Sequence, residues 1–123
     1  MKASGNSWAN GYGIAGRDGE LLFFPVGFGQ AYRTGYFIPE NQWTHIAATY
    51  DGIDAKVYVN VSLYGTQTIE SPIPTNNFPL GVGGDPGWAP FNFFGALDEV
   101  RVWSKALTQA EIQANMNCEI QTT

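Results

Sequence analysis

The segment 94–112 reads FGALDEVRVWSKALTQAEI and decides the fold. In an extended chain, successive side chains point to opposite faces. Residues 97, 99, 101 and 103 would therefore lie on one face, and residues 98, 100 and 102 on the other. The second face carries Val100 and Val102, and the first ends on Trp103. This alternation predicts a strand over Ala96–Trp103.

The end of the same segment carries the signature of a helix start. Thr108 and Glu111 have the Thr-x-x-Glu spacing of a capping box, in which each residue satisfies a backbone N–H of the other. Leu107 before the cap and Ile112 after it are placed as a hydrophobic staple. We expect a helix from Thr108 to about Asn117, and no other segment of the chain has a helical pattern.

Two further segments support one interpretation. Residues 42–52 read QWTHIAATYDG, with AKVYVN at 55–60, and residues 79–85 read PLGVGGD. These segments, followed by the segment 94–112, stand in the same order as in the laminin-G-like domains of the concanavalin A-like lectin/glucanase superfamily, which they resemble. There a Trp-x-His-x-Ala strand turns at Asp-Gly into a strand ending Tyr-Val-Asn-Gly, and a glycine-rich loop precedes the closing strand. The resemblance covers residues 12 to 115.

The resemblance implies an all-β fold, an antiparallel jelly-roll β-sandwich of the concanavalin A-like type with one short C-terminal helix. It also implies a sugar-binding or adhesive module. We assign residues 1–123 to a single domain of this kind. The family pattern begins only near Tyr12, so the opening strand region is expected to be shortened or missing.

The composition agrees with an all-β fold. The 123 residues include 15 Gly and 7 Pro, and 15% are aromatic, which is typical of short strands separated by tight turns. We expect strands at Tyr12–Ala15, Leu21–Val26, Gln30–Thr34, Trp43–Tyr50, Ala55–Val59, Tyr64–Ile69, Pro79–Gly83 and Ala96–Trp103.

Charge and hydropathy narrow the choice of partners. The formal net charge is -5 and the six basic residues are scattered, whereas nucleic acids and anionic membranes favour clustered Lys and Arg. We therefore expect no nucleic-acid partner and no membrane partner. No apolar run is long enough to span a bilayer.

Residues 1–6 lack the apolar core of a signal peptide, so an extracellular or cell-surface location is suggested by the family alone. Cys118 is the single cysteine, which leaves a free thiol or a bridge to another chain.

Two turns can be examined from the residues alone. Asp18-Gly19 is expected to form a hairpin turn, because both residues tolerate positive φ. Val61 stands where the family usually has glycine after Asn60. Because a β-branched residue resists positive φ, we expect a shifted or longer turn there.

The residues give no support for an enzyme. Retaining glycoside hydrolysis needs two carboxylates about 5–5.5 Å apart. The adjacent Asp98 and Glu99 would face opposite sides of the predicted strand, and no other spacing fits. His45 is the single histidine and lies far from Cys118 in sequence, which leaves no Cys-His pair or multi-histidine zinc site. We expect His45 to pack or to form a hydrogen bond.

Asp98 is the candidate metal ligand. In related jelly rolls the Asp that opens this Asp-x-Val-Arg-Val strand ligates a structural calcium, so the resemblance implies a possible calcium cofactor and no other. Calcium needs six to eight oxygen ligands, of which Asp98 supplies one or two. The alternative is that Asp98 caps neighbouring backbone donors inside the sandwich.

Sugar recognition requires flat aromatic rings for the C–H faces of pyranoses and nearby amides for their hydroxyls. Trp88 is the strongest candidate, because the prolines at 86 and 90 restrict the conformation of its loop. The alternative for each ring is that it merely covers the sandwich. The candidates outside the expected core are Trp88, Trp8, Tyr32, Tyr36 and Tyr64, with Asn76 as an accompanying amide.

These observations lead to a non-catalytic recognition module whose partner is a carbohydrate or glycoconjugate. The alternative is an adhesion or assembly domain that binds protein, or itself, through an exposed sheet edge. If the opening strand is missing, unpaired N–H and C=O groups invite a second copy and a homo-oligomer results. If Lys2–Trp8 folds back as that strand, the edge is covered.

Overall fold

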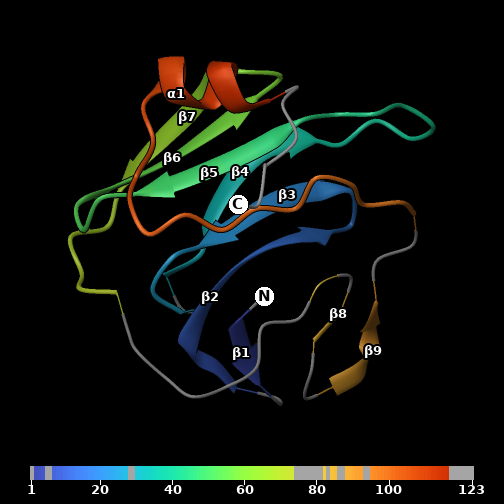
Figure 1. The fold of residues 1–123 in the computed structure, drawn as a ribbon. Coiled ribbons are helices and arrows are strands. Elements are labelled where there is room, and N and C mark those ends of the chain that lie inside the picture. Colours follow the sequence, from blue (N-terminus) through green and yellow to red (C-terminus); the bar gives the residue numbers. More distant parts are fainter. Residues whose placement is uncertain are drawn as a thin grey trace, which may run out of the picture.

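The computed structural model describes residues 2–4, 7–27, 30–73, 82, 84–85, 88–92 and 95–116, with side chains described for 11–27, 30–73, 82 and 95–116. These residues form a β-sandwich with one short helix near the C-terminal end (Figure 1). The first sheet has the order β1-β2-β3-β4, the second the order β5-β6-β7, and β8 and β9 form a hairpin. Each of these pairings is antiparallel, as the sequence predicts.

The elements have the following bounds. The first sheet comprises β1 (Lys2–Ser4), β2 (Ser7–Arg17), β3 (Glu20–Phe24) and β4 (Tyr32–Phe37). The second comprises β5 (Ile46–Tyr50), β6 (Asp54–Val59) and β7 (Ser62–Thr68). The hairpin comprises β8 (Gly84–Asp85) and β9 (Trp88–Asn92), and the helix is α1 (Gln109–Asn115).

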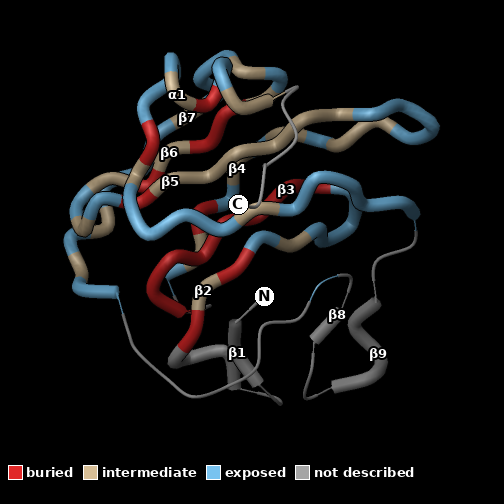
Figure 2. Tube along the Cα trace, viewed as in Figure 1, coloured by how far each residue is buried: buried red, intermediate tan, exposed pale blue. Residues whose placement is uncertain are grey.

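The main core lies between the two sheets. Strand β3 is buried along its whole length, and the alternate residues Ala55 and Val57 of β6 are both 0% exposed (Figure 2). Full burial of a large apolar side chain contributes about 1.5–3 kcal/mol each, so this contact is the principal stabilising feature. The buried members of the core are Leu21, Phe23, Val26, Tyr32, Tyr50, Ala55 and Val57.

A second, smaller cluster lies on the outer face of β5 and β6. Tyr58 of β6 packs there with Leu107 and Ile112, and Ala47 of β5 completes the contact. Leu107 and Ile112 are the two residues of the predicted hydrophobic staple. They fix α1 against the sheet.

The helix start is confirmed in detail. The Glu111 N–H donates to Thr108 Oγ1 and the Thr108 N–H donates to Glu111 Oε1, both at 3.2 Å, which completes the capping box. Lys105 Nζ lies 2.8 Å from the other Glu111 oxygen. Because the cap and this ion pair share one carboxylate, residues 105–111 are held as a unit.

The segment 96–103 differs from the sequence-based expectation. Within residues 95–108, which the structure describes, no residue belongs to a strand, so the strand predicted over Ala96–Trp103 is wrong. Glu99 has φ 53°, outside the extended region, and this interrupts the alternation on which the prediction was based. Arg101 donates to the carbonyl oxygen of Asn115 and to Glu99 Oε2, which ties the segment to α1. The strand expected at Pro79–Gly83 lies, apart from residue 82, outside the described residues.

Of the turns expected from the sequence, the one at Asp18-Gly19 is confirmed and the one at Val61 differs. Asp18 and Gly19 have φ values of 53° and 85° between the paired residues Arg17 and Glu20, so the predicted hairpin turn is confirmed. Asn60 and Val61 also have positive φ, 48° and 76°, between the paired ends of β6 and β7. The turn therefore consists of Asn60 and Val61 alone, and the shifted or longer turn expected at Val61 is wrong.

Contacts of Asn60 explain how the tight turn forms despite Val61. Asn60 Oδ1 accepts a hydrogen bond from the His45 N–H at 3.0 Å, and the Asn60 N–H donates to the His45 carbonyl oxygen at 2.9 Å. These two bonds fix Asn60 in the left-handed conformation. Val61 must follow it, at a conformational cost that a glycine would avoid.

Strand β1 occupies the position beside β2 that the sequence pattern left unassigned. Lys2 pairs with Tyr12 and Ser4 pairs with Ser7 across this edge. The sequence left two possibilities, a missing opening strand or an N-terminal segment that folds back to replace it. The structure has the second arrangement. No helix among the described residues combines the length and hydropathy that crossing a bilayer requires.

Candidate ligand-binding site

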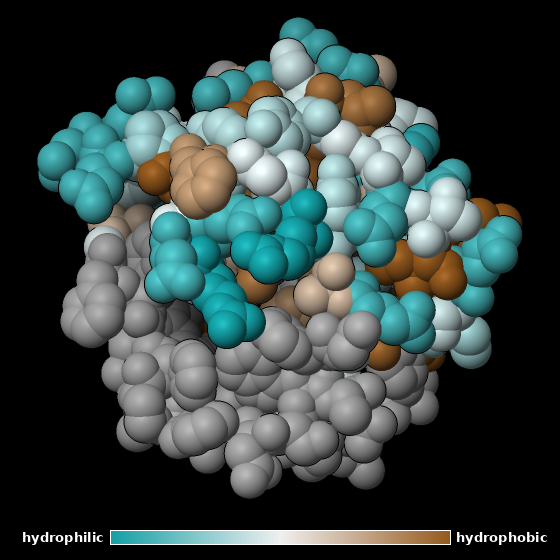
Figure 3. Space-filling model, turned by 180° about the vertical axis from the view of Figure 1, so that it is seen from behind, coloured by the Kyte–Doolittle hydropathy of each residue, from teal (hydrophilic) through white to brown (hydrophobic). Residues whose placement is uncertain are grey.

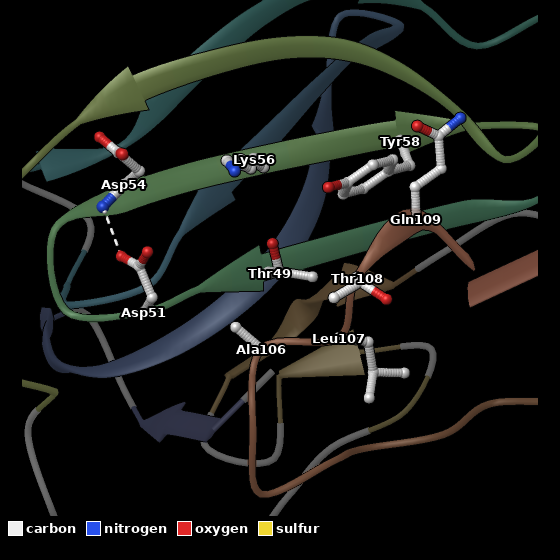
Figure 4. Close-up of a pocket in the computed structure, with 9 residues that line it drawn as sticks. All are labelled: Thr49, Asp51, Asp54, Lys56, Tyr58, Ala106, Leu107, Thr108 and Gln109. Atoms are coloured by element: carbon white, nitrogen blue, oxygen red, sulfur yellow. Dashed lines mark hydrogen bonds between the residues drawn. The ribbon is translucent and has the colours of Figure 1, made fainter. Parts of the chain in front are cut away.

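A pocket of about 320 Å³ lies on the outer face of β5 and β6, beside the segment that leads into α1 (Figure 4). Polar groups of four kinds gather there: hydroxyls, carboxylates, an amine and an amide. The lining residues are Thr49, Asp51, Asp54, Lys56, Tyr58, Ala106, Leu107, Thr108 and Gln109.

The alternation of β6 builds the floor of the pocket. Ala55 and Val57 are buried in the main core, so Asp54, Lys56 and Tyr58 project from the opposite face. In β5, Thr49 lies directly opposite Lys56 in the ladder and therefore shares its face. Figure 4 shows these side chains standing on the same side of the two strands.

Residues 106–109 form the wall of the pocket. Leu107 is anchored in the small cluster with Tyr58, and Thr108 caps the helix. Thr108 and Gln109 therefore reach the pocket from a segment whose position is fixed by packing and by the capping box.

The two carboxylates are held by hydrogen bonds. Asp51 Oδ1 accepts from the N–H groups of Asp54 at 2.7 Å and Ile53 at 2.9 Å, and these bonds lower the pKa of Asp51 below its usual value. Asp54 Oδ1 accepts from the Thr68 hydroxyl at 2.8 Å. A carboxyl with a lowered pKa is suited to accept hydrogen bonds, whereas a general acid requires a raised pKa.

Lys56 is the cation of the pocket. Its side chain is half-buried, and no carboxylate of the described residues lies within ion-pair distance of it. The nearby charge of Lys56 also contributes to the lowered pKa of Asp51. An ammonium group in this position can donate hydrogen bonds to a bound molecule.

Two of the three tyrosines selected from the sequence meet at the edge where β4 approaches β7. The rings of Tyr36 and Tyr64 form an edge-to-face pair with centroids 5.1 Å apart, and the Tyr64 hydroxyl donates to the Gly35 carbonyl oxygen at 3.3 Å. Tyr32, however, is only 8% exposed and belongs to the main core, so the expectation that it lies outside the core is wrong. It points inward because strand β4 places it on the same face as the core residues of β3.

The other sugar-binding candidates fall where side chains are not described. Trp8 lies in β2 and Trp88 in β9, but their side chains are outside the described part, and Asn76 lies outside it altogether. Their roles stay predictions. The structure brings together Tyr36 and Tyr64 and does not bring either of them into the pocket on β5 and β6.

Asp98 is exposed, and its Oδ1 accepts a hydrogen bond from the Glu99 N–H at 2.9 Å. The contact is a cap of a neighbouring backbone donor, but it lies on the surface and not inside the sandwich as the alternative to a metal role expected. Among the described residues, no three His, Cys, Asp or Glu side chains gather as a metal centre requires. Calcium binding by Asp98 stays a prediction.

His45 lies just before β5 and is half-buried. Burial, and then the nearby charge of Arg101, lower its pKa, so the imidazole is neutral at pH 7. The hydrogen bonds of His45 to Asn60 involve only its backbone, and its buried Nδ1 has no hydrogen-bond partner among the described residues. That the His45 side chain packs or forms a hydrogen bond stays a prediction.

Sequence reasoning missed the pocket and one exposed ring. The alternation Asp54, Lys56, Tyr58 was visible, but that these side chains share a pocket with residues 106–109 depends on the docking of α1. Trp43 was assigned to a strand. Instead it precedes β5 and is 70% exposed, and Figure 2 shows the β4–β5 connection as an exposed protrusion.

The two antiparallel sheets with one short helix define a protein of the β-sandwich class. A laminin-G family model, described as the concanavalin A-like lectin/glucanases superfamily, matches residues 2–113. The chain belongs to this family. The fold and the family resemblance derived from the sequence are thus confirmed.

Comparison with known proteins gives relatives of much greater length. The chain is 36% identical over 80 residues to Pappalysin-1 of Mus musculus and 38% identical over 80 residues to Pappalysin-1 of Homo sapiens. Each match covers 61% of this chain and 5% of the relative. The chain therefore corresponds to a small part of those proteins.

A solved structure shares the fold. It is the crystal structure of residues 221–444 of an S-layer domain-containing protein from Clostridium thermocellum, with a TM-score of 0.55 and 18% sequence identity. The match covers 85% of this chain and 63% of that chain. Laminin-G-like domains are generally non-catalytic modules.

Proposed function

We propose that this protein is a non-catalytic, extracellular carbohydrate-binding module, with the pocket on β5 and β6 as its binding site. The observation that carries the proposal is the set of polar groups lining that pocket. Family membership supports a recognition module of extracellular proteins, and the pocket supports a sugar as the molecule recognised.

The chemistry of the lining suits a polyhydroxyl ligand. Each sugar hydroxyl both donates and accepts, so a sugar is recognised best where fixed acceptors and fixed donors alternate. Asp51 and Asp54 are acceptors, Lys56 is a donor, and the Gln109 amide is both. The methyl group of Ala106, which is half-buried, offers apolar contact to the C–H groups of the ring.

Hydrogen bonds already present in the protein preorganise this lining. Asp51 is fixed by two backbone donors, and Asp54 by the Thr68 hydroxyl. The wall residue Thr108 is fixed by the helix cap. A ligand therefore meets side chains whose conformational freedom is already restricted, which lowers the entropic cost of binding.

A glycan array probed with the purified protein tests the proposal, followed by calorimetric titration of the glycans that bind. Lys56→Ala should weaken binding at least tenfold, because a donor at the centre of the pocket is lost. Arg17→Ala is the matched control: it removes the same charge from an exposed position in the other sheet. If the array is negative, or if both variants bind as the wild type does, the proposal is wrong.

A second candidate function is self-association or protein adhesion. Four apolar residues of the segment 97–103 are about half exposed: Leu97 at 50%, Val100 at 55%, Val102 at 58% and Trp103 at 45%. Among the coloured residues of the opposite side, seen in Figure 3, hydrophobic side chains lie in separate small patches among hydrophilic ones. Isolated apolar groups are normal on a surface, whereas a run of them suits a protein contact.

Light scattering at high micromolar concentration tests this second function. A dimeric mass that becomes monomeric in Val102→Asp would support a homo-oligomer formed through this segment. A monomeric mass for the wild type would exclude self-association as its role.

A further inference from the structure

We propose that the pocket is the closed end of a longer binding track, which crosses the outer face of β5, β6 and β7 and takes an uncharged oligosaccharide chain rather than a single terminal sugar. The inference rests on the proposed function and adds the size and charge of the ligand. It comes from the residues of β7, none of which lines the pocket itself.

The ladder pairing extends the polar face from the pocket onto β7. Thr49 lies opposite Lys56, and Lys56 lies opposite Thr66, so these three residues form one row across the three strands. Asp54 and Thr68 form a second, parallel row. Paired residues of neighbouring strands share a face, so both rows continue the floor of the pocket.

The orientation of β7 follows from the main core. Gln67 pairs with Ala55, which is buried between the sheets, so Gln67 belongs to the inner face. Its neighbours Thr66 and Thr68 therefore project from the outer face. The side chains of residues 66 to 68 are all exposed, because β7 lies at the edge of the three-stranded sheet.

The dimensions of the polar face exceed those of a single pocket. Neighbouring strands lie about 4.8 Å apart, so the rows extend about 10 Å from β5 to β7. Residues 106–109 bound this surface on the β5 side, where they form the pocket wall. On the β7 side, none of the described residues forms a wall of the pocket. A ligand seated in the pocket can therefore continue over Thr66 and Thr68.

The hydrogen-bonding groups along the rows match successive sugar units. The Thr68 hydroxyl donates to Asp54 Oδ1 at 2.8 Å, which fixes the orientation of its proton and leaves its oxygen as an acceptor. The exposed Thr66 hydroxyl makes no hydrogen bond to another described residue and can serve as donor or acceptor. Threonine methyl groups add apolar contact between these sites.

The charges of the site favour an uncharged chain. Two carboxylates, Asp51 and Asp54, outnumber the single cation Lys56 among the lining residues. The whole protein carries a net charge of -5. Sulfated, uronic or sialylated chains would therefore approach a surface of the same sign.

The test is a length series of uncharged oligosaccharides measured by calorimetric titration. The probes are the β-1,4-glucan, β-1,3-glucan and β-1,4-xylan series, each from one to six sugar units. We expect the affinity for a bound series to rise at least tenfold between the monosaccharide and the longer members and then to level off. Thr66→Val, which removes only the hydroxyl and preserves the β-branched shape, should weaken binding of the longer members several-fold and leave the monosaccharide unaffected.

Gln67→Ala provides the matched control, because Gln67 lies next to both threonines but on the inner face. It should bind every member as the wild type does, and thermal melting confirms that each variant is folded. Equal affinity for the monosaccharide and the longest member overturns the track and leaves the pocket as the site. An absence of binding to all three series, together with a negative glycan array, overturns the proposed function and the track with it.

Discussion

Gly65 of β7 is required by the close approach of Tyr32 from the opposite sheet. A Cβ atom built on Gly65 would lie 2.0 Å from the Tyr32 hydroxyl oxygen and 3.3 Å from the ring carbon that carries it. Cβ contacts under 3.0 Å are essentially never seen, so the hydroxyl must retreat by about 1 Å in a Gly65→Ala variant. Tyr32 is 8% exposed within the main core and has little room to move.

The expected cost follows from these distances. Overpacking a well-filled core costs about 1–3 kcal/mol, and replacing a glycine by alanine in a strand returns about 0.5–1 kcal/mol through backbone entropy. We therefore expect Gly65→Ala to lose about 1–2 kcal/mol of the free energy of unfolding. For a domain of this size, that corresponds to a melting temperature lower by about 4–8 °C.

Two further variants isolate the steric cause. Gly16→Ala in β2 is the matched control, because its Cβ would meet nothing within 4 Å, and it should be neutral or slightly stabilising. Tyr32→Phe removes the clashing oxygen and should recover at least half of the loss when combined with Gly65→Ala. The reasoning is refuted if Gly65→Ala melts like Gly16→Ala, or if the double variant shows no recovery.

Three other predictions concern single residues. Val61→Gly should raise the free energy of unfolding by about 0.5–1 kcal/mol in denaturant titration, because the left-handed conformation costs a β-branched residue about 1–2 kcal/mol; a lower midpoint would show that Val61 is not strained. Hydrogen bonds from Arg33 and a backbone N–H lower the pKa of Glu20 below 4.5, so its stabilising effect is complete above that pH and is lost as the pH falls through the lowered value. Melting of the wild type should therefore approach that of Glu20→Gln only in acid, and a constant difference down to pH 2 would exclude this linkage. If Asp98 helps to hold calcium, EDTA should lower the melting temperature of the wild type and not that of Asp98→Asn, and unchanged melting of the wild type would end that hypothesis.

The parts of the fold that depend on local chemistry were predictable from the sequence. The capping box of Thr108 and Glu111 and the hairpin turn at Asp18-Gly19 formed as expected, because both depend on residues close in sequence. Strands β3 to β7 were located within a few residues for the same reason, whereas β1 was not assigned and β2 begins five residues before the predicted strand. Alternation and turn residues are local signals.

The errors arose where contacts distant in sequence outweigh local preference. Val61 adopts positive φ because Asn60 is fixed by His45, which lies far away in the chain. The segment 96–103 has the alternation of a strand, but its Arg101 is tied to the end of α1 instead of joining a sheet. Tyr32 and Tyr64 look alike as sequence candidates, and only the packing of β4 against β7 makes one a core residue and the other a surface residue.

The candidate site, too, was predictable only where it depends on residues close in sequence. That Asp54, Lys56 and Tyr58 share one face could be derived from the strand period. That this face meets Thr108 and Gln109 to form a pocket could not, because it requires the docking of α1 through Leu107 and Ile112.

The most direct test of the central claim is NMR chemical-shift mapping with a glycan that binds on the array. Backbone amide signals of the ¹⁵N-labelled protein are assigned and followed during titration with that glycan. Our account predicts that the largest shifts occur at Thr49, Lys56 and Gln109, with small or no shifts at Tyr36. Shifts concentrated at the Tyr36–Tyr64 edge, with those of Thr49 and Lys56 unchanged, would contradict it.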